Sequence, residues 1–333
     1  MNSSKRQYVS EFALHFYSNR WVLTPSNQLM SDSKISDNDS KDVFNSSHIY
    51  LITKLPKLSF SKAEYSNENQ KIYGEVLYRK KGSVCESNFE MPFQFADDAT
   101  SIRISDYPHR ELQMINDEGN EVRYIPANIL TPYIGWCTNN PDLRDLEVLY
   151  IGKSYSEKKN RNITDRLKNH STLQKILAEV AYNDPDDEVY IIAMEFNPSA
   201  FISQIDGRNK DVLIDDEKVD LNRFKKISES NISKEAEVSL IEAGLIRYFQ
   251  PSYNKTYKYN FPSQDYKILE ECLNLDFTGL VVEINTEELS CRLFSNTAKP
   301  SGIHFCQFNL SDPEVRQGFF EAIFDSNSPN VVN

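Results

Sequence analysis

The pattern of apolar and polar positions divides the chain into three parts. In the first part, short apolar runs such as 49–52 and 72–78 alternate with turn residues as far as residue 129. Runs of this length between turn signals are typical of β-strands. We therefore predict a mostly β domain over residues 1–130. Almost every side chain near residues 31–47 is polar, which favours a flexible loop there.

The middle part, residues 131–258, mixes strand-like runs with helical spacing. Three strands are expected, the first two as a hairpin, at Pro132–Thr138, Glu147–Gly152 and Glu188–Phe196. Helical periodicity is expected over residues 164–182, in two pieces that break near Ser171, and from the N-cap Ser233 to Tyr248. The polar stretch 203–232 is expected to form a long connection. The fold class is therefore α/β of the α+β type, with a three-stranded antiparallel sheet flanked by helices.

The third part, residues 259–333, is predicted to be a small acidic α+β region. Short strands are expected at residues 279–284, 290–294 and 303–308, and helices at 265–273 and 312–324. Residues 261–333 carry 4 basic and 11 acidic side chains, so this part supplies much of the net charge of −12.

The composition argues against several classes of protein. No run of eighteen apolar residues exists, so a membrane span is not expected. The first residues, Met1 to Arg6, lack the features of a signal peptide. Five scattered cysteines without a C-x-x-C pair indicate free thiols, no zinc site and a reducing compartment. A cytoplasmic location is therefore expected, with no membrane partner and no organic cofactor.

Charge is distributed unevenly, and one stretch is basic. Residues 150–170 hold six basic and two acidic side chains. Local potential draws a polyanion to a site even when the whole protein is acidic. The alternative is a solvated surface loop with a chance excess of charge. The candidate nucleic-acid contacts in and beyond this stretch are Lys158, Lys159, Arg161, Lys168, Arg247 and Lys255.

One carboxylate interrupts the apolar stripe of the helix that follows Ser233. Glu242 lies among Val238, Leu245 and Ile246 at helical spacing, and none of its neighbours three or four residues away is basic. A carboxylate in this setting needs a partner from another segment. The residues alone leave two readings open: a metal ion bound by Glu242, or an ion pair with a distant arginine.

Four further positions could join Glu242 in a phosphate site. Arg166 and His170 lie four residues apart on a helical pattern, and such a pair could hold a phosphate from one side. Tyr150 and Asn254 would by themselves be read as a core strand residue and a turn residue.

The combination of these segments resembles the GIY-YIG nuclease superfamily. Tyr150-Ile151-Gly152 matches the second half of the name motif, with Lys153-Ser154 after it. Arg166 to His170 is similar to the family's Arg-x-x-x-His segment, and Glu242 to Asn254 to its glutamate helix with a Pro-x-x-Asn ending. The stretch from Phe196 to Ser233 is longer than in compact members of the family, which implies an insertion near residues 203–232. The first half, Gly-Ile-Tyr, is absent as written. In its place we consider Tyr133-Ile134-Gly135-Trp136, with Tyr133 or Trp136 supplying the aromatic side chain and Gly135 the glycine.

The resemblance implies roles for these residues. Glu242 would hold one divalent ion, Mg²⁺ or Mn²⁺, with waters completing its shell. Tyr150 would accept a proton from the attacking water, with its pKa lowered by Lys153, Arg166 and the metal. Arg166 would neutralise charge on the phosphate, His170 would assist proton transfer or hold the phosphate, and Asn254 would fix local geometry.

The resemblance further implies that the chain is a metal-dependent DNA endonuclease acting on double-stranded DNA. Restriction, phage defence and a mobile element are all open as its context. The alternative is a binding or regulatory protein that keeps the fold without cleavage, which the altered first half-motif and the acidic C-terminal part would favour. Cleavage of RNA, the target sequence and the oligomeric state are left open by the sequence.

Overall fold

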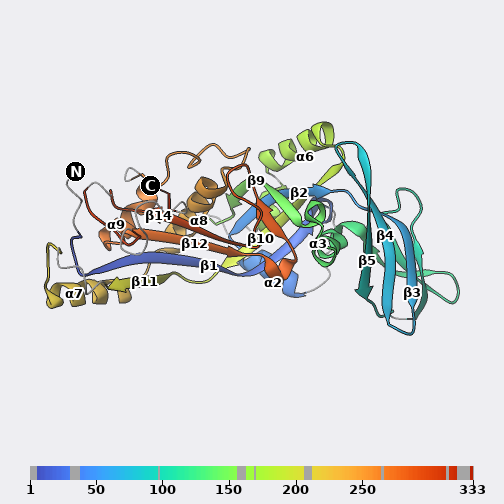
Figure 1. Cartoon of the computed structure of the whole chain (residues 1–333), viewed down its shortest axis with the longest axis horizontal. Coiled ribbons are helices and arrows are strands. Elements are labelled where there is room, and N and C mark those ends of the chain that lie inside the picture. The colour runs from blue at the N-terminus through green and yellow to red at the C-terminus, as the bar shows by residue number, and fades with distance from the viewer. Residues whose placement is uncertain are drawn as a thin grey trace.

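The protein is mixed α/β and is built around one twisted sheet. The computed structural model describes residues 6–30, 38–96, 98–155, 163–168, 170–205, 212–263, 266–312, 315–320 and 331–332. Within these residues, nine strands form a sheet along the long axis of the protein (Figure 1). Their order is β13 (Arg292–Phe294), β9 (Asp145–Lys153), β2 (Ile49–Pro56), β10 (Asp187–Phe196), β1 (Ser10–Pro25), β12 (Gly279–Asn285), β14 (Ile303–Asn309) and β15 (Val331–Val332), while β11 (Ala200–Ile205) pairs with β1.

Strand β1 joins the two halves of this sheet. Its first half pairs antiparallel with β11 and parallel with β12, and its second half pairs antiparallel with β10. The register shifts between Ser18 and Arg20, where the strand exchanges one set of partners for the other. Strands from all three predicted parts therefore share one sheet. The predicted boundaries at residues 130 and 258 are wrong, because neither separates an independent core.

Strands β9, β2 and β10 are neighbours, and β2 runs antiparallel to both of the others. The segments 147–152 and 188–196 thus lie in one sheet, as predicted. The partner of β9 is not residues 132–138, however, but β2, from almost one hundred residues earlier in the chain.

The predicted strand at Pro132–Thr138 is instead part of helix α3 (Ala127–Cys137). Pro132 lies inside this helix and cannot donate to the carbonyl of Asn128. The hydroxyl of Tyr190 on β10 donates to that carbonyl, 3.0 Å away. A hydrogen bond from another strand thus compensates for the donor that Pro132 lacks.

Residues between β2 and β9 form an inserted module with its own core. Two three-stranded sheets, helix α3 and helix α4 (Pro141–Arg144) make up this module, at the right of Figure 1. The sheets consist of β3 (Ser59–Ser66), β4 (Lys71–Lys80) and β5 (Ser83–Pro92), and of β6 (Ala99–Ile104), β7 (Glu111–Asn116) and β8 (Glu121–Pro126). Phe60, Val76, Leu112 and Leu143 are among its buried side chains. The predicted β-rich unit exists, but its core extends over residues 58–143.

Helices cover both faces of the central sheet. Alternate residues of β2 point to opposite faces, so Ile49 and Leu51 join one core cluster while Tyr50 and Ile52 join another. Helix α8 (Lys234–Phe249) packs on the first face. The other face is covered by α1 (Ser26–Met30), α2 (Asn38–Ser46), α5 (Ile163–Lys168) and α6 (Ser171–Asn183). Helix α2 occupies part of the predicted loop at 31–47, of which residues 31–37 lie outside the described residues.

Two other predicted segments differ from the structure. Part of the polar stretch 203–232 is helix α7 (Glu217–Ser228), whose N-terminus is capped by Asp216. The predicted closing helix at 312–324 is not formed over 315–320, where the chain makes turns and a bridge. The remaining short elements are the 3-10 helices η1 (Lys267–Leu269) and η2 (Glu287–Leu289) and helix α9 (Glu270–Asn274). No helix in the described ranges is long and apolar enough to cross a membrane.

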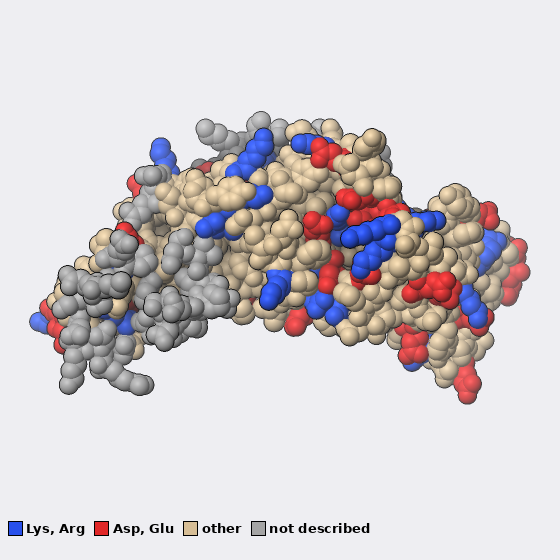
Figure 2. All heavy atoms as spheres, turned by 45° about the horizontal axis from the view of Figure 1, so that its top comes forward, with Lys and Arg blue, Asp and Glu red and all other residues tan. Residues whose placement is uncertain are grey.

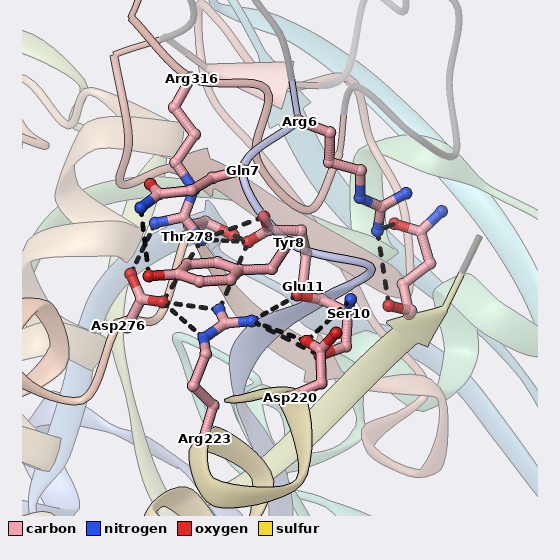
Figure 3. A network of polar contacts seen from close by, with 11 residues as sticks. Arg6, Gln7, Tyr8, Ser10, Glu11, Asp220, Arg223, Asp276, Thr278 and Arg316 are labelled. Atoms are coloured by element: carbon pink, nitrogen blue, oxygen red, sulfur yellow. Dashed lines mark hydrogen bonds and ion pairs between the residues drawn. The ribbon is translucent and has the colours of Figure 1, made fainter. Parts of the chain in front are cut away.

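A buried network of charges ties the chain ends to α7 (Figure 3). The Glu11 side chain is fully buried and accepts hydrogen bonds from Arg316 at 2.8 Å and Thr278 at 2.9 Å. Asp276 accepts from Arg316 and from Arg223, each at 2.6 Å. Burial raises the pKa of Glu11, while Arg316 acts in the opposite direction. The arginines therefore compensate a carboxylate that the core would otherwise leave uncompensated.

We expect Arg316→Ala to destabilise the protein by about 3–5 kcal/mol, the usual cost of breaking a buried ion pair from one side. Denaturant unfolding monitored by circular dichroism measures this loss. Lys62→Ala is the control, because Lys62 pairs with Glu64 on an exposed surface of β3 and such pairs contribute about 1 kcal/mol or less. Equal unfolding midpoints for the two variants would contradict the role given to this network.

Candidate active site

A bulge in β9 aims Tyr150 at the face covered by α5 and α6. In the pairing with β2, Tyr150 lies opposite Ile52 and Val148 opposite Thr53, so Leu149 has no partner. Leu149 and Tyr150 consequently both contact the core on that face, although they are adjacent in sequence. Bulges occur often beside active sites because they redirect a side chain.

The loop after α8 holds the free edge of this bulged strand. Strand β13 pairs only with residues 145–147 of β9. Beyond them, the Tyr253 amide donates to the carbonyl of Leu149 at 3.1 Å. The Asn254 side chain accepts from the Ile151 amide at 2.9 Å and donates to the Ile151 carbonyl at 2.8 Å. Asn254 thus replaces a strand neighbour and fixes the backbone beside Tyr150, the geometric role expected from the sequence.

The side chain that lies beside Tyr150 is Tyr50 of β2, which the sequence reasoning missed. Their ring centroids are 6.2 Å apart. A Cβ atom at Gly152 would lie 2.6 Å from the Cζ and the hydroxyl oxygen of Tyr50, and 2.8 Å from a ring carbon of Tyr150. Gly152 therefore provides the space into which the two rings pack. Tyr50 itself is fully buried, so its role is to position its neighbours.

His170 also lies beside Tyr150, but it does not share a helix face with Arg166 as predicted. Helix α5 ends at Lys168, and His170 is the N-cap of α6, with its Nδ1 accepting from the Leu173 amide at 3.3 Å. A neutral imidazole that accepts at Nδ1 carries its proton on Nε2. Nε2 lies 3.4 Å from the Tyr50 hydroxyl and therefore donates to it. Burial and the Arg166 guanidinium lower the pKa of His170, which favours this neutral form.

Arg166, on α5, interacts with the Tyr50 hydroxyl and with the charge of Glu242. Its guanidinium keeps one buried donor, Nε, without a hydrogen-bond partner in the described structure. The Nε atoms of Arg144 and Arg247 are buried without a hydrogen-bond partner in the same way, so this feature is not peculiar to the site. The charge of the Arg166 guanidinium suits an anion such as a phosphate group, which arginine binds with several donors at once.

Glu242 enters the site from α8 and is bridged to Lys153, not to a distant arginine. Its Oε2 lies 3.4 Å from the Lys153 ammonium, which also donates to Ser239 at 2.7 Å. The Glu242 side chain keeps 15% of its area exposed, so it faces a partly open site and not a closed core. Burial raises the pKa of Glu242, while Lys153 and Arg166 act to lower it. A cation would relieve the cost of burying this carboxylate.

The tyrosines do not behave as the sequence led us to expect. Burial first, and the Glu242 carboxylate second, raise the pKa of Tyr150 in spite of Arg166. Burial raises the pKa of Tyr50 further. The expectation that Lys153 and Arg166 would lower the pKa of Tyr150 is therefore wrong for the protein groups alone, because burial outweighs the neighbouring positive charge.

The residues considered for the first half-motif lie elsewhere. Tyr133, Gly135 and Trp136 are on α3, in the inserted module. A Cβ at Gly135 would lie 2.6 Å from the backbone of Leu143, so this glycine allows α3 and α4 to pack closely. Trp136 is 40% exposed and lies under Arg144, and Tyr133 interacts with Cys137. All three have structural explanations within the module, and their assignment to the site is wrong.

The predicted nucleic-acid contacts are only partly described. Lys158, Lys159 and Arg161 lie outside the described residues, as does the side chain of Lys168. Lys255 is exposed, and Arg247 donates to the Lys258 carbonyl at 3.4 Å. On the face shown in Figure 2, basic side chains occur in separate groups with acidic ones among them. Attraction of a polyanion by the stretch 153–168 stays a prediction.

The arrangement has one carboxylate for a metal ion. No group of three or more His, Cys, Asp or Glu side chains that could enclose a metal exists in the part of the chain that the structure describes. A site with Glu242 alone fits Mg²⁺, which keeps several waters and uses one or two carboxylates together with substrate phosphate oxygens.

Five side chains from five elements thus meet at one place: Tyr50, Tyr150, Arg166, His170 and Glu242, with Lys153 and Asn254 supporting them. Comparison of the chain with protein-family models, with curated proteins and with solved structures found no match.

Proposed function

We propose that this protein is a metal-dependent endonuclease that hydrolyses phosphodiester bonds of double-stranded DNA through a GIY-YIG-like site. The observation that supports this most strongly is the meeting of Tyr50 and Tyr150 on adjacent strands with Arg166, His170 and Glu242 around them. The sheet order β9–β2–β10 provides the three antiparallel strands that the resemblance implies. In this proposal Tyr50 takes the place of the tyrosine missing from the first half-motif, which weighs against an inactive relative.

In this proposal, Arg166 binds the scissile phosphate, because it lies beside Tyr50 and Glu242 and its charge neutralises the pentavalent transition state. A divalent cation, when bound to Glu242, supplies positive charge that polarises the phosphate and offsets the carboxylate. Lys153, already 3.4 Å from that carboxylate, completes the positive surroundings of the phosphate.

Tyr150 acts as its phenolate, formed by prior loss of the phenol proton to solvent, and accepts the proton of the attacking water as the water oxygen bonds to phosphorus. The bond from phosphorus to the leaving oxygen breaks and that oxygen takes a proton from solvent, so the products are a phosphate monoester and a free hydroxyl group. Tyr150 is suited to this because it is only partly buried, whereas Tyr50 is enclosed. His170 donates to the Tyr50 oxygen and so fixes the direction of the Tyr50 hydroxyl relative to Tyr150. Asn254 keeps the β9 backbone in place.

We expect Tyr50→Phe to slow single-turnover cleavage of plasmid DNA by roughly tenfold or more, since a misplaced catalytic group can lose about a hundredfold. Tyr150→Phe should lose about a hundredfold or more, because general acid–base catalysis contributes that much.

The matched control is Tyr133→Phe, the tyrosine that the sequence alone pointed to. It lies in the inserted module and should leave cleavage unchanged. If Tyr133→Phe lost activity while Tyr50→Phe kept it, the assignment of the site to β2 and β9 would be wrong.

A further inference from the structure

Large apolar side chains are exposed on the outer side of helix α7. Leu221 is 50% exposed and Phe224 is 43% exposed. Ile205 of β11, 71% exposed, lies beside the same helix: it is opposite Ser10 in the strand pairing, and the Ser10 amide donates to Asp220 of α7 at 3.2 Å. Figure 1 shows α7 and β11 together at one end of the long axis of the protein. A group of exposed apolar side chains on a protein surface marks a candidate site of association.

The inner side of α7 is anchored by charges and rings. Arg223 donates to Asp276 at 2.6 Å, as part of the network in Figure 3. Phe224 contacts Phe201 of β11, with ring centroids 5.8 Å apart. Because these contacts fix the rotation of the helix about its axis, the outward direction of Leu221 is fixed as well.

Two opposite charges flank Leu221 symmetrically along the helix. Glu217 lies four residues before it and Lys225 four residues after it, so all three are on one side of α7. Both charged residues are exposed, and neither side chain forms an ion pair or hydrogen bond with another residue that the structure describes. They are about 12 Å apart along the axis, at 1.5 Å per residue, which is too far for them to pair within one chain. These charges also suit the helix dipole, but the dipole does not account for the exposed Leu221 between them.

The outer stripe of α7, formed by Glu217, Leu221, Phe224 and Lys225, is complementary to itself in the antiparallel direction. When two copies of α7 pack antiparallel across a two-fold axis at Leu221, each Glu217 faces the Lys225 of the second copy. The two leucines meet at the axis, and each Phe224 packs beside them. A two-fold interface requires such a surface, because the same residues supply both of its sides. Parallel packing would instead place like charges opposite each other.

We propose that the outer stripe of α7 is the interface of a homodimer with two-fold symmetry. A second copy of the chain fits this stripe better than a polyanion such as DNA, which Asp215, Asp216 and Glu217 would repel at the start of the helix. The interface is small, so we expect a dissociation constant in the micromolar range, as for transient complexes. The inference concerns association alone and does not depend on cleavage.

Sedimentation velocity of the full chain, without DNA or metal, measures this association. The mass should rise with protein concentration from 38.5 kDa toward twice this value, between low micromolar and submillimolar concentrations. A protein that stays monomeric over this range would overturn the proposal. A mass that rises beyond that of a dimer would overturn it as well, because a two-fold interface closes with two copies.

Charge reversal tests whether the copies meet at this stripe. Lys225→Glu makes the stripe acidic at both ends, and Glu217→Lys makes it basic at both ends. Each variant should therefore raise its own dissociation constant by at least about tenfold, since like charges then face each other. An equal mixture of the two variants should dimerise about as well as the parent, because every acidic end then meets a basic one. Lys62→Glu, at an exposed position of the inserted module, is the control and should leave the dimer unchanged.

The double variant Glu217→Lys/Lys225→Glu separates pairing from a general effect of charge. It exchanges the two ends of the stripe and keeps them complementary, so it should dimerise like the parent. Leu221→Ser should weaken the dimer by about tenfold, because it removes the apolar contact at the axis. Circular dichroism of each variant checks that the fold is intact. Single variants that dimerise like the parent, or a double variant as weak as the single ones, would overturn the proposal.

Discussion

Glu242→Gln is expected to abolish Mg²⁺-dependent cleavage of DNA, with a loss of at least about a thousandfold. A metal ion contributes several kcal/mol to stabilisation of the transition state, and each 1.36 kcal/mol corresponds to about tenfold in rate. Glutamine keeps the shape of the side chain but is a poor ligand for a hard cation. DNA binding should persist, because Arg166 and Lys153 remain and no phosphate contact is removed.

The same substitution should leave the fold intact. Burial already disfavours the charged form of Glu242, and Lys153 keeps its hydrogen bond to Ser239 when the carboxylate is gone. Glu235→Gln, on an exposed position of the same helix, is the matched control and should cleave normally. Single-turnover cleavage and anisotropy binding measured for both variants separate catalysis from binding. A Glu242→Gln protein that cuts as fast as the parent would exclude the metal role.

Gly152→Ala is expected to reduce cleavage by about a hundredfold and to destabilise the protein by roughly 1–3 kcal/mol. The new methyl group would lie within 2.6 Å of Tyr50 and 2.8 Å of Tyr150, both of which are held by packing. Overpacking of this kind costs about 1–3 kcal/mol, and a displacement of a reacting group by about 1 Å can cost about a hundredfold in rate.

Gly302→Ala is the control for this second prediction, because a Cβ there would meet only the flexible side chain of Glu287. A double-mutant cycle with Tyr50→Leu identifies the cause. Gly152→Ala should cost less stability in the Tyr50→Leu background, where the ring that it strikes is gone. An equal loss of stability in both backgrounds would show that Gly152 is not required to make room for the Tyr50 ring.

Much of the site could be predicted from local signals. Helix α8 runs from the Ser233 cap to Phe249, as its spacing and cap residue indicated, and α5 and α6 break near Ser171 as expected. Glu242 was recognisable because a carboxylate in an apolar helical stripe requires a partner. These features depend on residues a few positions apart, where periodicity and capping act directly.

The missed parts depend on contacts between distant segments. Tyr50 lies one hundred positions before Tyr150, and an inserted module separates them. A hairpin with the nearest apolar run, Pro132–Thr138, was the expectation, and a helix forms there instead. The run Ile49-Tyr50-Leu51-Ile52 did carry a signal, since an unbroken apolar run is typical of a strand covered on both faces. A central strand has a neighbouring strand on each side, and residues 147–152 of β9 were a candidate for one of these neighbours.

The pKa values at the site illustrate a second limit of prediction from the sequence. The sequence shows that cations accompany Tyr150, but not how deeply the phenol is buried. In the folded protein, burial and Glu242 together outweigh Arg166 and raise the pKa of Tyr150. Proton transfer to Tyr150 is therefore expected to require that the charge of Glu242 be offset, which links the metal requirement to the base.

The most direct test is incubation of the purified full chain with supercoiled plasmid DNA, in Mg²⁺ and in parallel with EDTA. Nicked or linear plasmid in Mg²⁺, with intact plasmid in EDTA, is the result predicted for a single-metal phosphodiesterase site at Tyr150 and Glu242. Plasmid that stays intact in both Mg²⁺ and Mn²⁺ while the protein binds it, or that is cut equally in EDTA, would contradict that account.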